Sequence, residues 1–310
     1  MASSDTAADT AADTATHVFQ EHRSLLTGVA YRMLGRVTDA EDVVQEAWLR
    51  WSGADREAVR EPRGYLVRIT TRLAIDRLRQ VQARHESYVG PWLPEPIATD
   101  FGHTVPDTAE RAVLAESVSL AVLVVLESLS PLERAVFVLR EAFGFPYGEI
   151  AAALDRTEAA VRQLAGRARR HVGTRKPRFE VDPGQRRDLT ERFLAAARGG
   201  DLEELLALLA PGARLVGDTD GKSKAPLRIM ETADKIARFL VAVGQGTVPE
   251  SELVFTELNG GFAMVLFSAG RPDTALSLDV ADGRIQAVYI MRNPDKLTHL
   301  TELLPGGKGQ

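Results

Sequence analysis

Residues Leu129 to Val172 read LSPLERAVFVLREAFGFPYGEIAAALDRTEAAVRQLAGRARRHV, and two short helical patterns meet in this stretch at a tight turn. The first helix is expected from Pro146 to Leu154, followed by a turn at Asp155 and Arg156 and by Thr157 as N-cap of the second helix. At about 100° per residue, one side of the second helix carries Val161, Leu164, Ala165 and Ala168. The opposite side carries Arg162, Gln163, Gly166, Arg169 and Arg170. This pattern is typical of a helix-turn-helix with a polar face free to meet DNA; a helical hairpin with solvated arginines is the alternative.

The composition indicates a globular protein without disulfides. The 310 residues are 45% hydrophobic and include six His but no Cys, and no two His have the spacing of a metal-ligand pair. No apolar run reaches the length of a membrane span, and residues 1–16 lack the basic start and apolar centre of a signal peptide. We therefore expect a cytoplasmic protein without metal, cofactor or membrane contact.

The net charge of two segments differs strongly from the net charge of the whole chain. The net charge is -5, yet residues 60–84 contain seven Arg against only Glu61 and Asp76. Residues 156–178 contain seven Arg and Lys176 against only Glu158. Two basic islands in an acidic chain indicate two separate contacts with phosphate, although two solvated helical faces are the alternative.

The fold class expected from the sequence is a multi-domain protein, with two all-α domains followed by an α+β domain. Residues 5–16 repeat DTAA without large apolar groups, and residues 1–16 are expected to be a disordered tail. The boundaries that follow are 17–87 and 108–175 for the helical domains, 88–107 and 176–184 for the linkers, 185–303 for the α+β domain and 304–310 for a tail. The first linker is rich in Pro and Gly, and we expect its Trp92 and Leu93 to dock on a neighbouring surface.

The α+β domain begins with helical patterns and continues with a meander of strands. Helices are expected at 186–199, 202–209 and 229–243, and strands at 214–217, 252–258, 262–269, 274–280 and 285–291. Asn259-Gly260-Gly261 and Asp282-Gly283 mark turns. We therefore expect a curved sheet that wraps its helices into a cone, an arrangement that usually encloses a pocket.

The helix expected from Pro62 to about Gln82 separates charge from apolar packing. Its arginine side carries Arg68, Arg72 and Arg79, and another side carries Leu66, Ile69 and Leu73. Together with VTDAEDVVQEAWLRW (37–51) and the helix-turn-helix, the stretch PRGYLVRITTRLAIDRLR (62–79) resembles an extracytoplasmic-function sigma factor of bacterial RNA polymerase. The motifs WLPEP (92–96), DGK (220–222) and NPDKL (293–297) resemble the subgroup with a fused SnoaL-like domain of the nuclear-transport-factor-2 (NTF2) fold.

The resemblance implies that the acidic helix after Thr38 docks on the clamp helices of the polymerase core. The residues expected at that contact are Asp39, Glu41, Asp42, Gln45 and Glu46. The alternative is a solvated acidic face whose N-terminal acids suit the helix dipole.

The resemblance also implies that residues 55–84 read the promoter -10 element as melted single strand, which needs a basic groove and pockets for unstacked bases. The residues expected to hold the DNA backbone are Arg63, Arg68, Arg72 and Arg79. Asp76 has the spacing of an i, i+4 partner to Arg72. Two departures bear on this recognition, since family members commonly carry Trp where Tyr65 stands and Asn where Arg72 stands.

The second helix of the opening stretch would read the -35 element in the major groove. Arg162 and Gln163 are expected at base edges, because Arg suits guanine and Gln suits adenine. The other residues expected at this DNA surface are Arg156, Thr157, Arg167, Arg169 and Arg170, with the arginines on phosphate. Gly166 in mid-helix should cost about 1 kcal/mol relative to Ala unless a close backbone approach explains it.

The sequence therefore predicts a sigma factor, regulated in cis by its C-terminal domain. The regulatory contact is expected near Trp92, Leu93, Pro94, Asp220, Gly221, Lys222, Asn293, Pro294, Asp295, Lys296 and Leu297. One alternative is a SnoaL-like isomerase or cyclase that uses Asp218, Asp220 or Asp279 as a base. The other is a one-component DNA-binding regulator with a small-molecule ligand in the C-terminal pocket.

Overall fold

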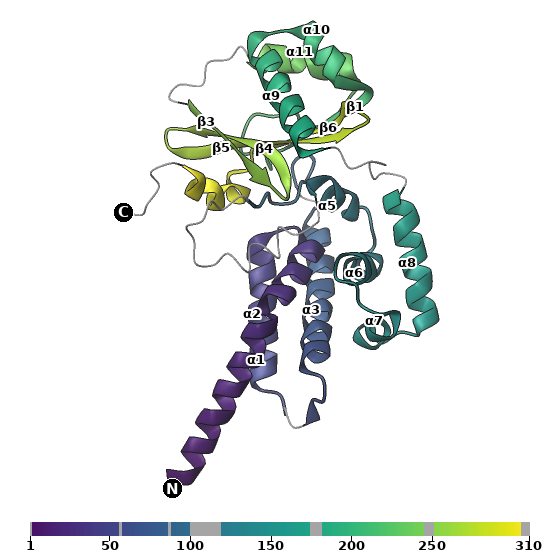
Figure 1. Ribbon diagram of the computed structural model, residues 1–310, viewed down its shortest axis with the longest axis vertical. Helices are drawn as coiled ribbons and strands as arrows, with labels where there is room; N and C mark the ends of the chain where they lie inside the picture. Colours follow the sequence, from purple (N-terminus) through teal and green to yellow (C-terminus); the bar gives the residue numbers. More distant parts are fainter. Residues whose placement is uncertain are drawn as a thin grey trace. The chain divides into compact units, whose positions relative to one another are not determined.

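The computed structural model describes residues 2–55, 58–85, 88–99, 119–173, 182–244 and 251–304, and the side chains of these residues except 2–13, 83–85 and 183. The chain forms two compact units (Figure 1). The helical unit comprises the described residues up to 84 and those from 125 to 173. The sheet unit comprises the described residues of 85–103, 119–124 and 182–304. Residues 100–107 and 176–181 of the predicted linkers and the tail from 305 lie outside the described residues.

Three helices form the first part of the helical unit: α1 (Ala2–Leu34), α2 (Val37–Ser52) and α3 (Pro62–His85). Gly35 ends α1 as predicted, because its left-handed backbone (φ 69°) lets its N–H donate to the carbonyl of Tyr31 at 2.7 Å. The buried apolar residues of the three helices include Leu26, Val29, Met33, Val43, Val44, Ala47, Leu66, Ala74 and Leu78. The helical periodicity seen in the sequence is thus the periodicity of a packed core.

The N-terminal segment differs from its sequence-based expectation. Residues 2–16 continue α1, whereas their composition predicts a disordered tail. Half of the DTAA repeat is alanine, the best helix former, and a helix that is already packed extends without forming a new nucleus. The end of the segment is also held, because Ala15 is buried and its carbonyl accepts a hydrogen bond from Trp51 Nε1 at 2.9 Å.

The second part of the helical unit contains the helix-turn-helix. It consists of the end of α5 (Leu120–Leu126), α6 (Pro131–Phe137), the π-helical turn η2 (Val138–Ala142), α7 (Tyr147–Leu154) and α8 (Glu158–Gly173). Asp155 adopts the left-handed conformation (φ 55°, ψ 53°) that the sequence requires of it, and Thr157 Oγ1 accepts from Ala160 N at 3.2 Å as the N-cap. Pro146 precedes α7 as its N-cap instead of lying in its first turn. The predicted packed face of α8 is buried.

The sheet unit begins with α9 (Pro183–Gly199) and α10 (Leu202–Leu208), and α11 (Ala233–Gly244) lies between its strands. The strands are β1 (Leu209–Asp218), β2 (Met230–Glu231), β3 (Ser251–Leu258), β4 (Gly261–Ser268), β5 (Arg271–Ala281) and β6 (Arg284–Met291). Their order in the sheet is β2-β1-β6-β5-β4-β3. The β1 and β6 strands pair in parallel, and the other pairs are antiparallel. The helix expected from Ile229 begins only at Ala233, because Met230 and Glu231 pair with β1.

The predicted α+β architecture is confirmed, and both predicted hairpin turns carry the positive φ that tight turns require, at Asn259-Gly260 and Asp282-Gly283. Register shifts within the β4–β5 and β5–β6 pairs add the local bends that curve a sheet. Figure 1 shows α9, α10 and α11 gathered on one face of this sheet. A hydrophobic core lies between these helices and the sheet, and it includes Phe193, Leu205, Ile236 and Val288, all fully buried.

A second core covers the opposite face of the sheet. Its members include Val265, Phe267 and Tyr289 from the strands, Leu93 and Ala98 from the first linker, and Leu120 and Ala121. Leu297 and Leu300 complete it from the short 3-10 turns η3 (Pro294–Lys296) and η4 (Thr298–Leu303). Among the residues that the structure describes, no helix is both long and apolar enough to cross a bilayer.

Candidate functional sites: the linker dock and the basic surfaces

A buried ion pair holds the first linker to the sheet unit. Lys296 of η3 and Asp218 at the end of β1 are 1% and 0% exposed, and Lys296 Nζ lies 2.7 Å from Asp218 Oδ2. The same ammonium donates to the carbonyl of Leu93 at 2.6 Å and lies 4.0 Å from the ring centroid of Trp92. Burying two charges is costly unless both are paired and hydrogen-bonded, and here the linker supplies a backbone acceptor and an aromatic face.

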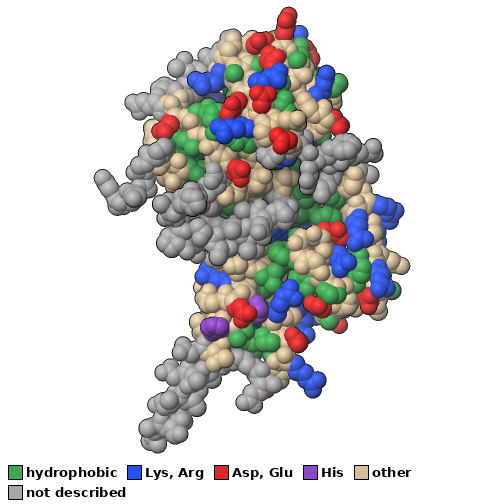
Figure 2. All heavy atoms as spheres, in the orientation of Figure 1, with side chains coloured by type: hydrophobic (Ala, Val, Ile, Leu, Met, Phe, Trp, Pro, Cys, Tyr) green, Lys and Arg blue, Asp and Glu red, His purple; other side chains and the backbone are tan. Residues whose placement is uncertain are grey.

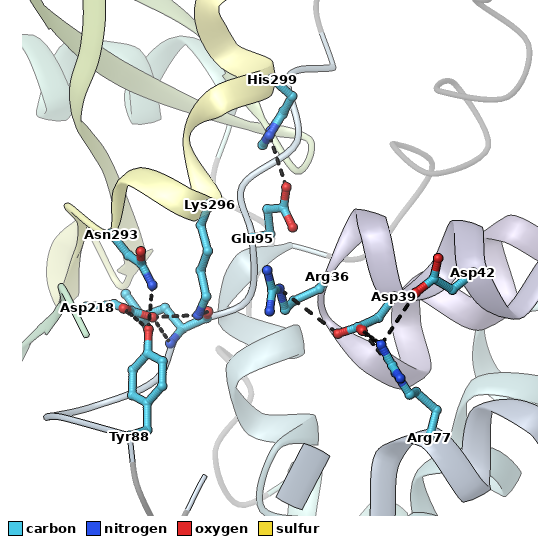
Figure 3. A network of polar contacts seen from close by, with 11 residues as sticks. Arg36, Asp39, Asp42, Arg77, Tyr88, Glu95, Asp218, Asn293, Lys296 and His299 are labelled. Carbon is cyan, nitrogen blue, oxygen red and sulfur yellow. Dashed lines mark hydrogen bonds and ion pairs between the residues drawn. The ribbon is translucent and has the colours of Figure 1, made fainter. Parts of the chain in front are cut away.

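Asp218 collects three donors at this site. Besides Lys296, it accepts the backbone N–H of Leu93 at 2.7 Å and the hydroxyl of Tyr88. The Tyr88 hydroxyl in turn accepts from Asn293 Nδ2 at 2.8 Å. Burial and the neighbouring Asp218 carboxylate raise the pKa of Tyr88 far above its ordinary value, so the phenol stays protonated and donates. Figure 3 shows Tyr88, Asn293 and Lys296 pointing toward Asp218; we call these residues, with Trp92 and Leu93, the linker dock.

The linker continues from the dock along the edge of the sheet. Thr99 N donates to Glu257 O and Asn259 N donates to Ile97 O, both at 2.8 Å, and Ala98 forms an antiparallel bridge with Leu258. The linker therefore pairs with the last residues of β3, which is otherwise an edge strand. Nearby, His299 Nδ1 lies 3.1 Å from Oε1 of the buried Glu95 of the WLPEP motif.

The three motifs singled out in the sequence come together around the dock. DGK forms a turn with positive φ at Asp220 and Gly221, and a Cβ at Gly221 would lie 3.3 Å from the Val89 side chain. Lys222 Nζ reaches Asp295 of NPDKL at 2.6 Å, and this pair is exposed. Pro94 and Leu297 are buried, whereas Pro294 and Asp295 are exposed. The sequence did not single out Tyr88, and it named Asp218 only as a candidate catalytic base, because nothing local shows that either side chain faces the linker.

The three carboxylates considered for catalysis have different surroundings. Asp218 is bonded to the linker, and Asp220 lies 3.2 Å from Lys222. Burial raises the pKa of Asp279, and the charge of Arg186 partly offsets the effect. Leu278 and Val280 belong to the core beneath the helices, so the alternation of a strand directs Asp279 to the other face of the sheet. None of the three carboxylates is thereby placed in the space between the helices and the sheet.

The exposed face of α8 is basic. Figure 2 shows Lys and Arg side chains gathered over α8. The predicted residues on this face are all exposed, namely Arg162, Gln163, Arg167, Arg169 and Arg170, and Arg156 and Thr157 lie exposed at its start. Acids hold several of the arginines: Glu158 pairs with Arg162, Glu133 lies 3.1 Å from Arg167, and Glu141 lies 2.8 Å from Arg169. A Cβ at Gly166 would meet nothing within 4 Å, so no packing contact in the described part of the chain explains that glycine.

The arginines of α3 are already engaged within the helical unit. Arg63 lies 4.5 Å over the ring of Phe145, and Arg72 Nε donates to the carbonyl of Ala153 at 3.0 Å. Arg68 lies 5.2 Å over the ring of Tyr65. Asp76 pairs with Arg79 at 3.1 Å and not with Arg72, because Arg72 reaches the end of α7 instead.

A pocket of about 540 Å³ lies at the start of α3. Its walls come from the loop between α2 and α3, from α3 and from α7, and the lining residues are Ala54, Asp55, Ala58, Val59, Arg60, Glu61, Gly64, Tyr65, Arg68, Glu149, Ala152 and Ala153. An aromatic ring, two arginines and a roomy cavity match what an unstacked base requires.

The acidic face of α2 differs from its expectation at one residue. Glu41, Asp42 and Gln45 are exposed, and Glu46 pairs with Arg50 at 3.0 Å. Asp39 is buried instead, and it accepts hydrogen bonds from Nε and Nη2 of Arg77 at 3.0 and 2.5 Å (Figure 3). It therefore ties α2 to α3 and does not reach the exposed face. That face also carries Leu49, which is 58% exposed and which the sequence analysis missed.

Replacing Lys296 by Met should destabilise the sheet unit, because it leaves the buried Asp218 carboxylate without its cation. The expected loss in the free energy of unfolding is roughly 3 to 5 kcal/mol. Lys222→Met is the matched control, since its ion pair is exposed and worth about 1 kcal/mol or less. Urea unfolding followed by tryptophan fluorescence measures both variants. Equal losses would contradict the buried pair, and adding Asp218→Asn to Lys296→Met should recover part of the loss.

Replacing Asp279 by Asn should raise the free energy of unfolding at neutral pH. Because the folded-state pKa of Asp279 is raised, the folded protein holds its proton to higher pH than the unfolded chain does, and stability falls as pH rises above the ordinary Asp pKa of 3.8. The advantage of the Asn variant should therefore shrink as the pH falls toward and below that value. Denaturant unfolding at a series of pH values measures the difference, and a pH-independent difference would contradict the assignment.

Comparisons with known proteins identify the family of this chain. Residues 18–84 match the Sigma-70 region 2 family, and residues 119–172 match the Sigma-70, region 4 family. The chain is 37% identical over 294 residues to the ECF RNA polymerase sigma factor SigJ of Mycobacterium tuberculosis (strain ATCC 25618 / H37Rv), covering 90% of this chain and 92% of that protein. It is 33% identical over 293 residues to the probable ECF RNA polymerase sigma factor SigI of Mycobacterium tuberculosis (strain CDC 1551 / Oshkosh), covering 93% and 97%.

The fold agrees with the same family. The crystal structure of the Mycobacterium tuberculosis extracytoplasmic function sigma factor SigJ superposes with a TM-score of 0.72 at 35% identity, covering 90% of this chain and 97% of that one. The chain therefore belongs to the extracytoplasmic-function sigma factors of RNA polymerase, with sigma-70 regions 2 and 4 followed by a C-terminal domain of helices and sheet.

Proposed function

We propose that this sigma factor attaches to the polymerase core through the exposed face of α2. The observation that carries the proposal is the combination of Asp42, Gln45 and Glu41 with the 58% exposed Leu49 on one short helix. An apolar side chain at the centre of a charged surface is typical of a protein interface, since the apolar core supplies burial and the polar rim supplies orientation. Asp39 supports this face from behind through Arg77, whose guanidinium also lies 3.4 Å from Asp42.

Region 2 then reads the -10 element as single strand. The pocket at the start of α3 has Tyr65 and Arg68 in its wall, and the arginine lies over the aromatic ring. Such a pair stacks on an extruded base and holds the neighbouring backbone. Arg63 and Arg72 also contact Phe145 and Ala153 of region 4, and both side chains remain exposed on the same helix.

Region 4 reads the -35 element with α8. Arg162 and Gln163 lie in its N-terminal half and are exposed, and this half of a recognition helix meets base edges. Arg156, Arg167, Arg169 and Arg170 hold phosphates around them. The unexplained Gly166 in the middle of α8 allows a close approach of the helix backbone to DNA.

The C-terminal domain regulates this activity in cis, in place of a separate inhibitory protein. The support is the linker dock, which binds residues 88–99 of the segment that joins region 2 to region 4. A domain that holds this segment controls how the two DNA-reading regions are connected. The relatives and family matches disfavour the alternative of a one-component regulator.

Replacing Leu49 by Asp should lower the affinity for core polymerase by about tenfold or more, because it places a charge at the centre of the interface. Val243→Asp is the matched control, since Val243 is 56% exposed but lies in the sheet unit. Pull-down of purified core and run-off transcription on promoters selected from the genome measure binding and activity. Equal behaviour of the two variants would rule out the α2 face as the docking surface.

Releasing the C-terminal domain should raise promoter output. Truncation to residues 1–184 removes the domain, but it also bares the apolar Leu93 and Leu120. Tyr88→Phe is the milder test in the full chain, because it removes only the hydroxyl that bonds Asp218 and Asn293. In-vitro transcription with saturating core compares both forms with the parent. Unchanged promoter output from both the truncated chain and Tyr88→Phe would contradict regulation in cis.

A further inference from the structure

Tyr147, the first residue of α7, lies where three arginines of region 4 converge. Arg140 of η2 and Arg162 of α8 place their guanidinium carbons 4.7 Å and 5.5 Å from its ring centroid. Arg169 of α8 donates from Nη2 to its hydroxyl at 2.7 Å. Tyr147 and Arg140 are half-buried, whereas Arg162 and Arg169 are exposed. One side chain of α7 therefore contacts two predicted DNA-binding residues of α8.

The contacts differ in kind from the ion pairs on the same surface. Glu158 pairs with Arg162 and Glu141 pairs with Arg169. Each of these acids offsets positive charge that would otherwise attract the phosphates of DNA. Tyr147 orients both arginines without adding negative charge. A free arginine loses side-chain entropy when it is immobilised on a ligand, so prior orientation strengthens each contact it later makes.

We infer that Tyr147 is a positioning residue for -35 recognition: its ring orients Arg162 for a base edge, and its hydroxyl orients Arg169 for a phosphate. The inference rests on the proposed reading of the -35 element by α8. It assigns two separable roles to one side chain, because the ring serves specificity and the hydroxyl serves sequence-independent affinity. The two roles distinguish it from an ordinary packing residue, whose loss would weaken all properties of region 4 together.

Two substitutions separate the roles in the full-length chain bound to core polymerase. Tyr147→Phe keeps the ring and removes the acceptor for Arg169, so base preferences should persist while binding weakens equally on all promoters. The slope of log affinity against log salt should fall in magnitude by up to about one phosphate contact. Tyr147→Leu removes the ring, so discrimination at the base pair read by Arg162 should fall by about three- to tenfold.

Phe143→Leu is the matched control. Phe143 lies in the same segment of region 4 and has a guanidinium 4.9 Å from its ring, but that guanidinium belongs to Arg32 of α1 and not to α8. This variant should leave both the -35 preferences and the salt slope of the parent unchanged. Thermal unfolding of all three variants checks that region 4 stays folded, and Tyr147→Phe keeps the inference testable if Tyr147→Leu does not fold.

The measurements are run-off transcription and competition binding on promoters changed singly at each -35 position, at several salt concentrations, with Arg162→Ala alongside. If Arg162→Ala abolishes the base preference at one -35 position and folded Tyr147→Leu keeps that preference, the inference is overturned while the proposed function stands. Equal loss of that preference in Tyr147→Phe and Tyr147→Leu also overturns it. If the parent itself shows no preference at any -35 position, the proposed reading by α8 fails, and the inference fails with it.

Discussion

The sheet unit depends on the buried pair of Lys296 and Asp218. An ammonium and a carboxylate at 1% and 0% exposure are stable only when their remaining hydrogen-bonding capacity is used. The first linker uses it, because Leu93 contributes both its carbonyl and its N–H and Tyr88 contributes a hydroxyl. The pair is therefore complete only with the linker in place, and the linker is part of the C-terminal domain although it precedes region 4 in the chain.

This dependence explains the chemistry of the three motifs. WLPEP supplies an aromatic face and extended backbone, which its prolines favour. NPDKL supplies the cation on a short 3-10 turn capped by Asn293, whose side chain accepts from Asp295 N at 3.1 Å. DGK supplies a turn beside the linker, where Gly221 leaves room for Val89. The motifs are far apart in the sequence, and each contributes side chains or backbone groups to contacts in or beside the linker dock.

The arginines on the basic faces of α3 and α8 are not buried like Lys296 but are held by contacts at the surface. The chain has a net charge of -5 but carries these two basic surfaces. Most of the arginines on these surfaces contact acids, aromatic rings or carbonyl groups of the protein itself. Where the partner is an acid, the contact offsets part of the charge that would otherwise attract phosphate non-specifically. On α8 the holding groups are mainly acids, whereas on α3 Arg63 and Arg72 contact a ring and a carbonyl of region 4, and both of these side chains stay exposed.

The amino-acid sequence by itself determined the helix-turn-helix, the hairpin turns and the order of helices and strands, because caps, left-handed turn residues and periodicity act within a few residues of one another. Only the tertiary structure decided that Asp39 is buried against Arg77, that Asp76 pairs with Arg79, and that Asp218 and Tyr88 hold the linker. These outcomes depend on segments separated by up to 130 positions. The sequence alone does not show whether a charged side chain faces solvent or a buried partner. The same limit applies to Tyr147, whose role follows from three arginines that only the packed helices bring to its ring.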